Sequence, residues 1–329
     1  MSAVDENLFD FMSHFSVTDN CDFHNLILIR IEHRQRYSIL QDLQNRISSC
    51  LWNNDVVWLD IFCFIRGNGY FCIVMRYFAE LRYDGAAYCG WQRQPDAPTV
   101  QRTVEDALSK IMRSPVEIVG AGRTDTGVNA SYYVAHFDTD AEFDTPQTLY
   151  KLNLMLPQDI SIDSITPVAA DAHARFDARE REYTYFISPK KNPFLRNSAW
   201  LYYVPLDVVR MNEAAAVLLE TSDFTTFAKL NSNNKTNICR VCRAEWQVED
   251  DGVFRFTIRA DRFLRNMVRA IVGTLVDVGR GRYTVEEFRE IVESRDLSRS
   301  SGGAPPQGLF LSDIVYPDDV FKKTNFNIN

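Results

Sequence analysis

The pattern of apolar and polar positions over 75–318 predicts strands and helices that follow one another along the chain. A two-residue repeat, typical of strands with one buried face, favours strands at 76–84, 116–121, 131–139, 159–166, 182–188, 238–249 and 253–260. A helical repeat favours helices at 99–112, 145–155, 206–220, 262–278 and 285–295. Since the strands look antiparallel and the helices fall between them, the pattern predicts an α+β fold with helices on one face of the sheet.

The helix predicted at 99–112 has the clearest pattern. Thr99 stands where an N-cap is expected, because a threonine hydroxyl can accept a hydrogen bond from a free amide of the first turn. The positions behind it form one apolar stripe, made of Val100, Val104, Ala107, Leu108, Ile111 and Met112. Such a stripe predicts a helix that lies on a hydrophobic core.

Two regions of different composition meet near Met75. Residues 1–74 hold four of the seven cysteines and contain no proline or lysine, whereas the regular pattern begins at Met75. We therefore expect an N-terminal extension of unknown role at 1–74, an α+β domain at 75–172, a second domain of similar layout at 173–318 and a tail at 319–329. One hypothesis for the extension is a start codon assigned too far upstream, with Met75 as the true initiator.

The composition is that of a globular protein, because 46% hydrophobic residues suffice to build sizeable cores. The net charge of −8 argues against a protein that coats nucleic acid, so a nucleic-acid site would have to be a local cluster of arginines. Seven cysteines in 329 residues do not suggest a disulfide framework, which favours the reducing cytoplasm. The most apolar segment, 56–74, contains Asp60 and Arg66 and is a poor candidate for a membrane span.

The loop "VGAGRTDTGV" (119–128) carries the candidate chemistry. It does not fit a dinucleotide-binding loop, because its third glycine comes late and a strand, not a helix, is predicted after it. "DTG" at 125–127 is also the tripeptide of aspartic proteases, which need two such carboxylates, and the chain has one copy. A plain turn explains many such strings. Arg123 beside Asp125 favours instead an ionised carboxylate that acts as a nucleophile or a base.

Five segments, in order along the chain, resemble the tRNA pseudouridine synthase A family. "GAGRTDTGVNA" matches a family core of G-R-T-D-x-G-V-x-A, and the other four segments are 81–95, 173–187, 263–281 and 304–311. The resemblance implies conversion of uridine to pseudouridine at positions 38–40, in the anticodon stem-loop of tRNA, without a cofactor. It also implies two RRM-like (ferredoxin-like) domains with antiparallel sheets joined across a central cleft, and a homodimer.

The resemblance further implies roles for single residues. Asp125 matches the essential aspartate, and Arg269 matches an arginine that forms an ion pair with it. Tyr183 falls where the family keeps a tyrosine against the target base. Leu309 or Leu311, in the closing motif "APPQGLFL", is expected to form an apolar wall of the uracil pocket.

Arg262, Arg265 and Arg269 recur at helical spacing within the helix predicted at 262–278, so they are expected on one stripe. A stripe of arginines is usually a solvated face. The resemblance makes Arg262 and Arg265 candidates for contacts with RNA phosphates.

Further RNA contacts are expected from the strand that opens the second domain. Because side chains alternate along a strand, Arg181, Tyr183 and Tyr185 should share one face. A cation beside aromatic rings suits phosphates and stacked bases, although tyrosines there can simply be half buried in a sheet. Arg181 is therefore expected to contact RNA, Tyr185 to be structural, and Arg123 to bind the substrate.

A non-catalytic RNA-binding protein of the same architecture remains the alternative, in which Asp125 is only a turn residue. A dimeric aspartic protease is a more distant alternative, because the predicted helices argue against its all-β fold. Cys239 and Cys242 form C-x-x-C without a second pair, so they are expected to be strand residues and not zinc ligands. We expect no metal site, and we expect His136 to be packed in the core.

Overall fold

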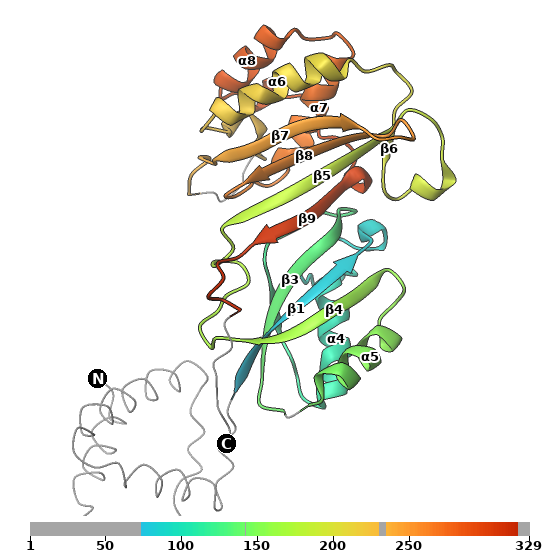
Figure 1. Ribbon diagram of the computed structural model, residues 1–329, viewed down its shortest axis with the longest axis vertical. Coiled ribbons are helices and arrows are strands. Elements are labelled where there is room, and N and C mark those ends of the chain that lie inside the picture. Colours follow the sequence, from blue (N-terminus) through green and yellow to red (C-terminus); the bar gives the residue numbers. More distant parts are fainter. Residues whose placement is uncertain (1–73, 142, 230–234, 322–329) are drawn as a thin grey trace, which may run out of the picture. The chain divides into compact units, whose positions relative to one another are not determined.

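The computed structural model describes residues 74–141, 143–229 and 235–321 (Figure 1). The extension predicted at 1–74 lies outside the described residues apart from its last position, and so does most of the tail predicted at 319–329. These two assignments, the hypothesis of a start at Met75 and the domain boundary expected near 172 stay predictions.

One sheet of nine strands runs through the described residues. Its order is β4 (Ile160–Val168), β1 (Met75–Tyr83), β3 (Asn129–Thr139), β9 (Leu309–Val315), β5 (Glu180–Ser188), β8 (Phe254–Ala260) and β7 (Val241–Val248). Two short strands lie off this path, β2 (Ile118–Gly120) beside β3 and β6 (Trp200–Leu201) beside β5. The pairs are antiparallel except β3 with β9 and β5 with β6. A mixed fold with a mostly antiparallel sheet is therefore confirmed.

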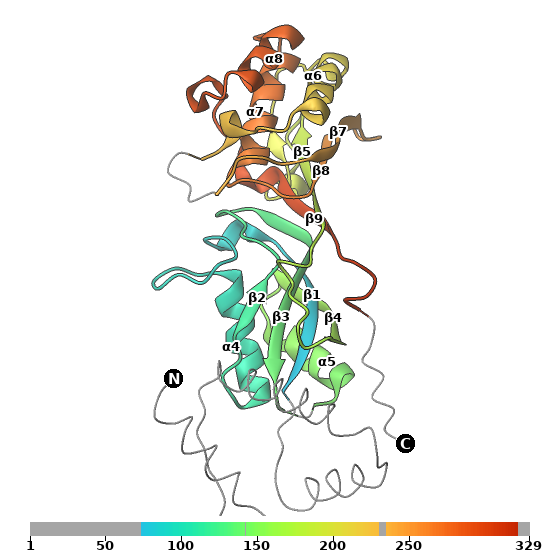
Figure 2. The same cartoon turned by 90° about the vertical axis from the view of Figure 1, so that its left-hand side faces the viewer.

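Five α-helices occur in the described residues, namely α4 (Val100–Met112), α5 (Thr145–Met155), α6 (Val208–Glu220), α7 (Met267–Gly279) and α8 (Val285–Glu293). Figures 1 and 2 show α4 and α5 against the half of the sheet with β1, β3 and β4, and the other three helices against the half with β5, β7 and β8. Each half has its own hydrophobic core. Leu108 and Leu152 belong to the first core, and Met211, Ile271 and Phe288 belong to the second.

Helix α4 forms where the sequence pattern predicts it. The Thr99 hydroxyl accepts a hydrogen bond from the Arg102 amide at 3.4 Å, which satisfies one of the free amides of the first turn. Val104 and Leu108, on the predicted apolar stripe, are buried. The cap and the stripe are both confirmed, so local signals were sufficient for this helix.

Strand β9 joins the two halves of the sheet and was not predicted. Its register places Leu311 opposite Ala130 of β3 on one side and opposite Tyr183 of β5 on the other. The segment before β9 is rich in glycine and proline, and the strand itself has no long alternating pattern. Its position depends on pairing with strands far away in the sequence, which no local pattern reports.

Helix α7 begins at Met267, later than the predicted start at 262. The residue before it, Asn266, has a φ of 65° in the left-handed region, where a right-handed helix cannot continue. Arg262 and Arg265 therefore lie in the connection before α7. The prediction that they share a helical stripe with Arg269 is wrong.

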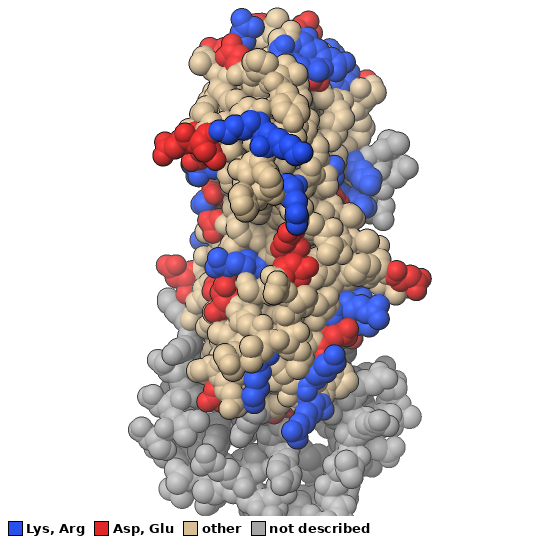
Figure 3. All heavy atoms as spheres, turned by 90° about the vertical axis from the view of Figure 1, so that its right-hand side faces the viewer, with Lys and Arg blue, Asp and Glu red and all other residues tan. Residues whose placement is uncertain are grey.

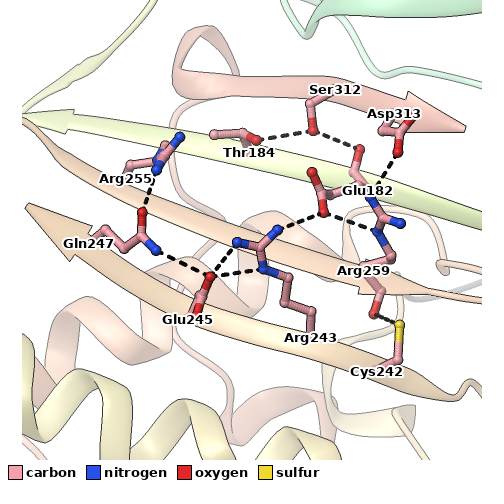
Figure 4. Close-up of polar contacts among 10 residues, drawn as sticks. All are labelled: Glu182, Thr184, Cys242, Arg243, Glu245, Gln247, Arg255, Arg259, Ser312 and Asp313. Atoms are coloured by element: carbon pink, nitrogen blue, oxygen red, sulfur yellow. Dashed lines mark hydrogen bonds and ion pairs between the residues drawn. The ribbon is translucent and has the colours of Figure 1, made fainter. Parts of the chain in front are cut away.

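Strand β5 presents different chemistry on its two faces. Figure 4 shows Glu182 and Thr184 on the face turned away from the helices, among charged side chains of β7, β8 and β9. Glu182 forms ion pairs there with Arg243 at 3.3 Å and Arg259 at 3.0 Å, and Arg259 also pairs with Asp313 at 2.7 Å. Tyr183, in contrast, packs against both hydrophobic cores. The alternation predicted for this strand is confirmed.

Candidate active site

The loop between β2 and β3 carries Asp125, and hydrogen bonds with two tyrosine hydroxyls and one tryptophan backbone amide hold this loop in place. The Tyr83 hydroxyl forms a hydrogen bond with the Thr124 hydroxyl at 2.9 Å, and the Tyr133 hydroxyl donates to the Gly122 carbonyl. The Trp91 amide donates to the Thr124 carbonyl at 3.3 Å. These hydrogen bonds fix Gly122 and Thr124, the residues on either side of Arg123, and thereby the backbone that leads to Asp125.

Two glycines allow this close packing. Gly90 has a φ of +85°, and a Cβ there would lie 2.3 Å from the Thr124 carbonyl oxygen. Gly127, with a φ of +75°, makes the turn that follows Asp125, and its amide donates to the Tyr88 carbonyl at 3.3 Å. The left-handed conformation and the lack of space both require glycine at Gly90.

Asp125 forms an ion pair with Arg265, whose Nε lies 3.3 Å from Oδ1 of the carboxylate. The Asp125 side chain is 28% exposed, so the carboxylate can be reached from solvent. Arg265 is 63% exposed and comes from the turn before α7. The pair brings together two segments that belong to different halves of the sheet.

Arg269 does not form the ion pair with Asp125 that the resemblance implies. Its Nε donates to the Ala304 carbonyl at 2.6 Å, and the Ala304 amide donates back to the Arg269 carbonyl at 2.9 Å. Among the described residues, the carboxylate contacts the Arg265 guanidinium instead. The reason is geometric, because α7 starts at Met267 and Arg269 in its first turn is held by the segment that precedes β9.

Tyr183 is close enough to Asp125 for the charge of the carboxylate to act on its hydroxyl. Burial raises the pKa of Tyr183 to about 12, against a lowering by the Arg181 guanidinium, and the negative charge of Asp125 adds to the rise. The ring packs edge-on against Phe263 with centroids 5.0 Å apart. Within the described part of the chain the Tyr183 hydroxyl makes no hydrogen bond.

Leu309 and Leu311 are both buried, at 5% and 2% exposure. Leu311 stands in register with Tyr183 and packs in the core of the first half, whereas Leu309 stands opposite Tyr185 and packs in the core of the second. Leu311 is therefore the nearer of the two to Tyr183 along the sheet. Which of them meets a substrate stays a prediction.

The other arginines predicted to contact RNA differ in whether their guanidinium groups already form hydrogen bonds within the protein. Arg123 is exposed, and in the described residues its side chain makes no hydrogen bond or ion pair. Arg262 is partly exposed, and within the described ranges its amide alone makes a hydrogen bond, to the Asp261 carboxylate at 2.7 Å. Arg181 is different, because its guanidinium donates to backbone carbonyls of the protein itself.

The charges on the face drawn in Figure 3 are mixed, with basic and acidic side chains interspersed over the described residues. Such a surface agrees with local rather than general attraction of a polyanion. A pocket of about 390 Å³ is lined by residues such as Asp84, Asn129 and Asp159 and does not include Asp125 or Tyr183.

Of the remaining polar candidates, His136 and Cys239 belong to the core. His136 is buried, its Nδ1 accepts a hydrogen bond from the Ala174 amide at 3.1 Å, and burial, followed by Arg76 and His173, lowers its pKa to about 4. Cys242 lies in β7 and is exposed, whereas Cys239 is buried and lies before β7 begins, so the prediction that both are strand residues is wrong for Cys239. Both are free thiols.

Over the described ranges, no group of three or more histidine, cysteine, aspartate or glutamate residues could hold a metal ion. The helices in those ranges are also too short or too polar to cross a membrane.

Sequence reasoning did not find the residues that support the site. Tyr83, Tyr133 and Trp91 stand in or near strands as aromatic residues that look like ordinary core, and Arg265 was expected at a phosphate. The long-range contacts that give these residues their place have no local signal.

The arrangement defines an enzyme site built on one carboxylate, with a guanidinium and a tyrosine beside it. A model of the tRNA pseudouridine synthase family matches residues 79–177 and 214–317 of the chain. The tRNA pseudouridine synthase A of Bacteroides thetaiotaomicron is 51% identical over 252 residues, which cover 76% of this chain and 94% of that protein.

Two further relatives of the same name give a similar picture. The protein of Porphyromonas gingivalis is 51% identical over 249 residues, or 75% of this chain and 99% of that protein. The protein of Thermoanaerobacter pseudethanolicus is 39% identical over 238 residues, or 72% and 97%. The chain therefore belongs to the tRNA pseudouridine synthase A family.

Proposed function

We propose that this protein converts uridine to pseudouridine at positions 38–40, in the anticodon stem-loop of tRNA, and that it uses no cofactor. The observation that carries the proposal is the position of Asp125. It stands in the family's loop motif, 3.3 Å from the Arg265 guanidinium, and its charge acts on the Tyr183 hydroxyl. The relatives described above are named tRNA pseudouridine synthase A, which supports the proposed reaction on tRNA uridine.

The reaction needs one ionised carboxylate. The bond from uracil N1 to C1′ of the ribose breaks, the base turns, and a bond from C5 to C1′ forms. The C5 proton is released and N1 ends with a proton, so atoms and charges balance. Asp125 either attacks C1′ or removes a proton from C2′ to start the sequence, and Arg265 stabilises its negative charge before and after this step.

The target uridine has to leave the base stack, which costs a few kcal/mol. Contact with the Tyr183 ring offsets part of this cost. Arg123 stands two residues before Asp125, and among the described residues neither its guanidinium nor that of Arg262 makes a hydrogen bond or an ion pair. We assign both to contacts with the RNA, and we assign an apolar wall of the uracil pocket to Leu309 or Leu311. Arg269 holds the segment before β9 against α7 and thereby supports that wall.

Release of tritium from tRNA labelled at C5 of uridine tests the activity. We expect release from transcripts whose uridine is kept at 38, 39 or 40, and none from a transcript that lacks uridine at all three. Tight tRNA binding without release would favour the alternative, a non-catalytic RNA-binding protein.

The finer architecture is part of the same proposal. We assign an RRM-like domain to 75–172 and a second to 173–318, with their sheets joined across a central cleft at β9 and β5. We also propose a homodimer in the cytoplasm. The mass of one chain is 37.9 kDa, so light scattering that gives this mass, and not twice this mass, would reject the dimer.

A further inference from the structure

The guanidinium of Arg181 joins three segments of the protein through four backbone carbonyls. Its Nη1 donates to the Ala178 carbonyl at 3.1 Å and to the Asp261 carbonyl at 3.3 Å. Its Nη2 donates to the Ala121 carbonyl at 3.0 Å and to the Arg175 carbonyl at 2.7 Å. One planar group with donors in fixed directions thus holds four backbone acceptors at once.

Two of these acceptors lead directly to the active-site pair. Ala121 lies at the start of the loop that carries Asp125, and Asp261 lies at the start of the connection that carries Arg265. The two carbonyls come from different halves of the sheet, yet both are within hydrogen-bonding reach of the same guanidinium. Arg181 is therefore a direct bridge between the segments that supply Asp125 and Arg265.

The environment of Arg181 is unlike that of a phosphate-binding arginine. Among the described residues no carboxylate pairs with it, and its contacts are backbone carbonyls of the protein. Burial lowers the pKa of this guanidinium from its ordinary value. An arginine that binds phosphates through ionic contacts keeps its donors free toward solvent, whereas both terminal nitrogens of Arg181 are already engaged.

We propose that Arg181 is a positioning residue that holds the loop of Asp125 in place against the connection that carries Arg265, and that it does not bind RNA phosphates. The proposal rests on the proposed function for its catalytic readout. It replaces the phosphate contact expected from the alternation of Arg181 with Tyr183. Since a misplacement of about 1 Å at a catalytic group can cost about 100-fold in rate, movement of the Asp125 carboxylate after loss of this bridge should be seen in kcat.

The test compares Arg181→Ala with Arg259→Ala. Arg259 is a matched control, because it is a partly buried arginine of the same sheet that makes ion pairs with Glu182 and Asp313 on the opposite face (Figure 4). We expect kcat for tritium release to fall about 100-fold in Arg181→Ala and to be nearly unchanged in Arg259→Ala. Ethylguanidinium added in solution should restore part of the activity of Arg181→Ala alone.

Binding and exchange measurements separate the possible outcomes. We expect the affinity for tRNA and its salt dependence to be unchanged in Arg181→Ala, and hydrogen exchange to rise in peptides over 121–128 and 261–266. Weaker binding with a salt slope reduced by about 1, at unchanged kcat, would identify a phosphate contact and overturn the proposal. Equal losses of kcat in both variants, without rescue, would also overturn it.

A second variant tests the proposal if Arg181→Ala does not fold. Arg181→Lys keeps the charge but cannot hold four acceptors in a plane. A fully active Arg181→Lys would overturn the proposal. If the wild-type protein releases no tritium, the proposed function fails, whereas the exchange measurement still tests the bridge.

Discussion

The contact between Gly90 and the loop that carries Asp125 gives a prediction that can be worked out from the structure. The change is Gly90→Ala, which adds one methyl group. That Cβ would lie 2.3 Å from the Thr124 carbonyl oxygen, and Gly90 has a φ of +85°. Both the backbone conformation and the space available oppose the substitution.

The two costs can be separated by a matched control. Gly252, in the turn between β7 and β8, has a φ of +81° and would meet nothing within 4 Å of an added Cβ. Gly252→Ala therefore has the conformational cost alone, about 1 kcal/mol, which lowers Tm by roughly 1–2 °C for a protein of this size. Its activity should be that of the wild type.

Gly90→Ala has the same conformational cost and must also move the Thr124 backbone by about 1 Å to reach an ordinary contact distance. A displacement of about this size at a catalytic group lowers the rate about 100-fold. The assay is single-turnover release of tritium at saturating tRNA, with Tm measured on the same samples. A Gly90→Ala protein that keeps more than about a third of the wild-type rate would refute the reasoning.

The other predictions concern charges. Asp125→Asn should abolish tritium release and leave tRNA binding nearly intact in a filter-binding assay, and full activity would remove the mechanism. Arg265→Gln should lower kcat by at most about fivefold, because an exposed ion pair contributes about 0.2–1 kcal/mol, and the difference should shrink at high salt; a 100-fold loss would contradict this. Burial lowers the pKa of His136 to about 4, so the unfolded state binds the proton first, and stability should fall as pH drops from about 6.5 toward 4, by up to about 3 kcal/mol. His136→Asn should flatten the dependence of Tm on pH. An unchanged dependence would show that His136 does not cause the loss of stability at low pH.

Sequence patterns predicted the elements whose causes are local. The cap at Thr99, the stripe of α4 and the alternation around Tyr183 depend on neighbours within a few residues, and all three agree with the structure. The start of α7 was missed because a left-handed residue at Asn266 interrupts a run that otherwise has helical spacing.

The geometry around Asp125 could be predicted only in part. The loop motif identified the carboxylate, but its ion pair is made by Arg265, which was assigned to phosphates. Arg181 was likewise assigned to RNA, although its four acceptors lie in segments up to 80 residues away in the sequence. A single sequence contains no record of such pairings, because each depends on how the sheet brings distant segments together.

The central place of β9 has a consequence for the order in which the protein is made. The ribosome synthesises β1, β3 and β5 long before β9, so the two halves of the sheet stay unjoined during most of translation. Contacts between residues so far apart in the chain form slowly. Until β9 pairs with them, the unpaired edges of β3 and β5 are prone to aggregation. Pulse-labelled chains should therefore become resistant to protease only after the strand near the carboxyl terminus has left the ribosome.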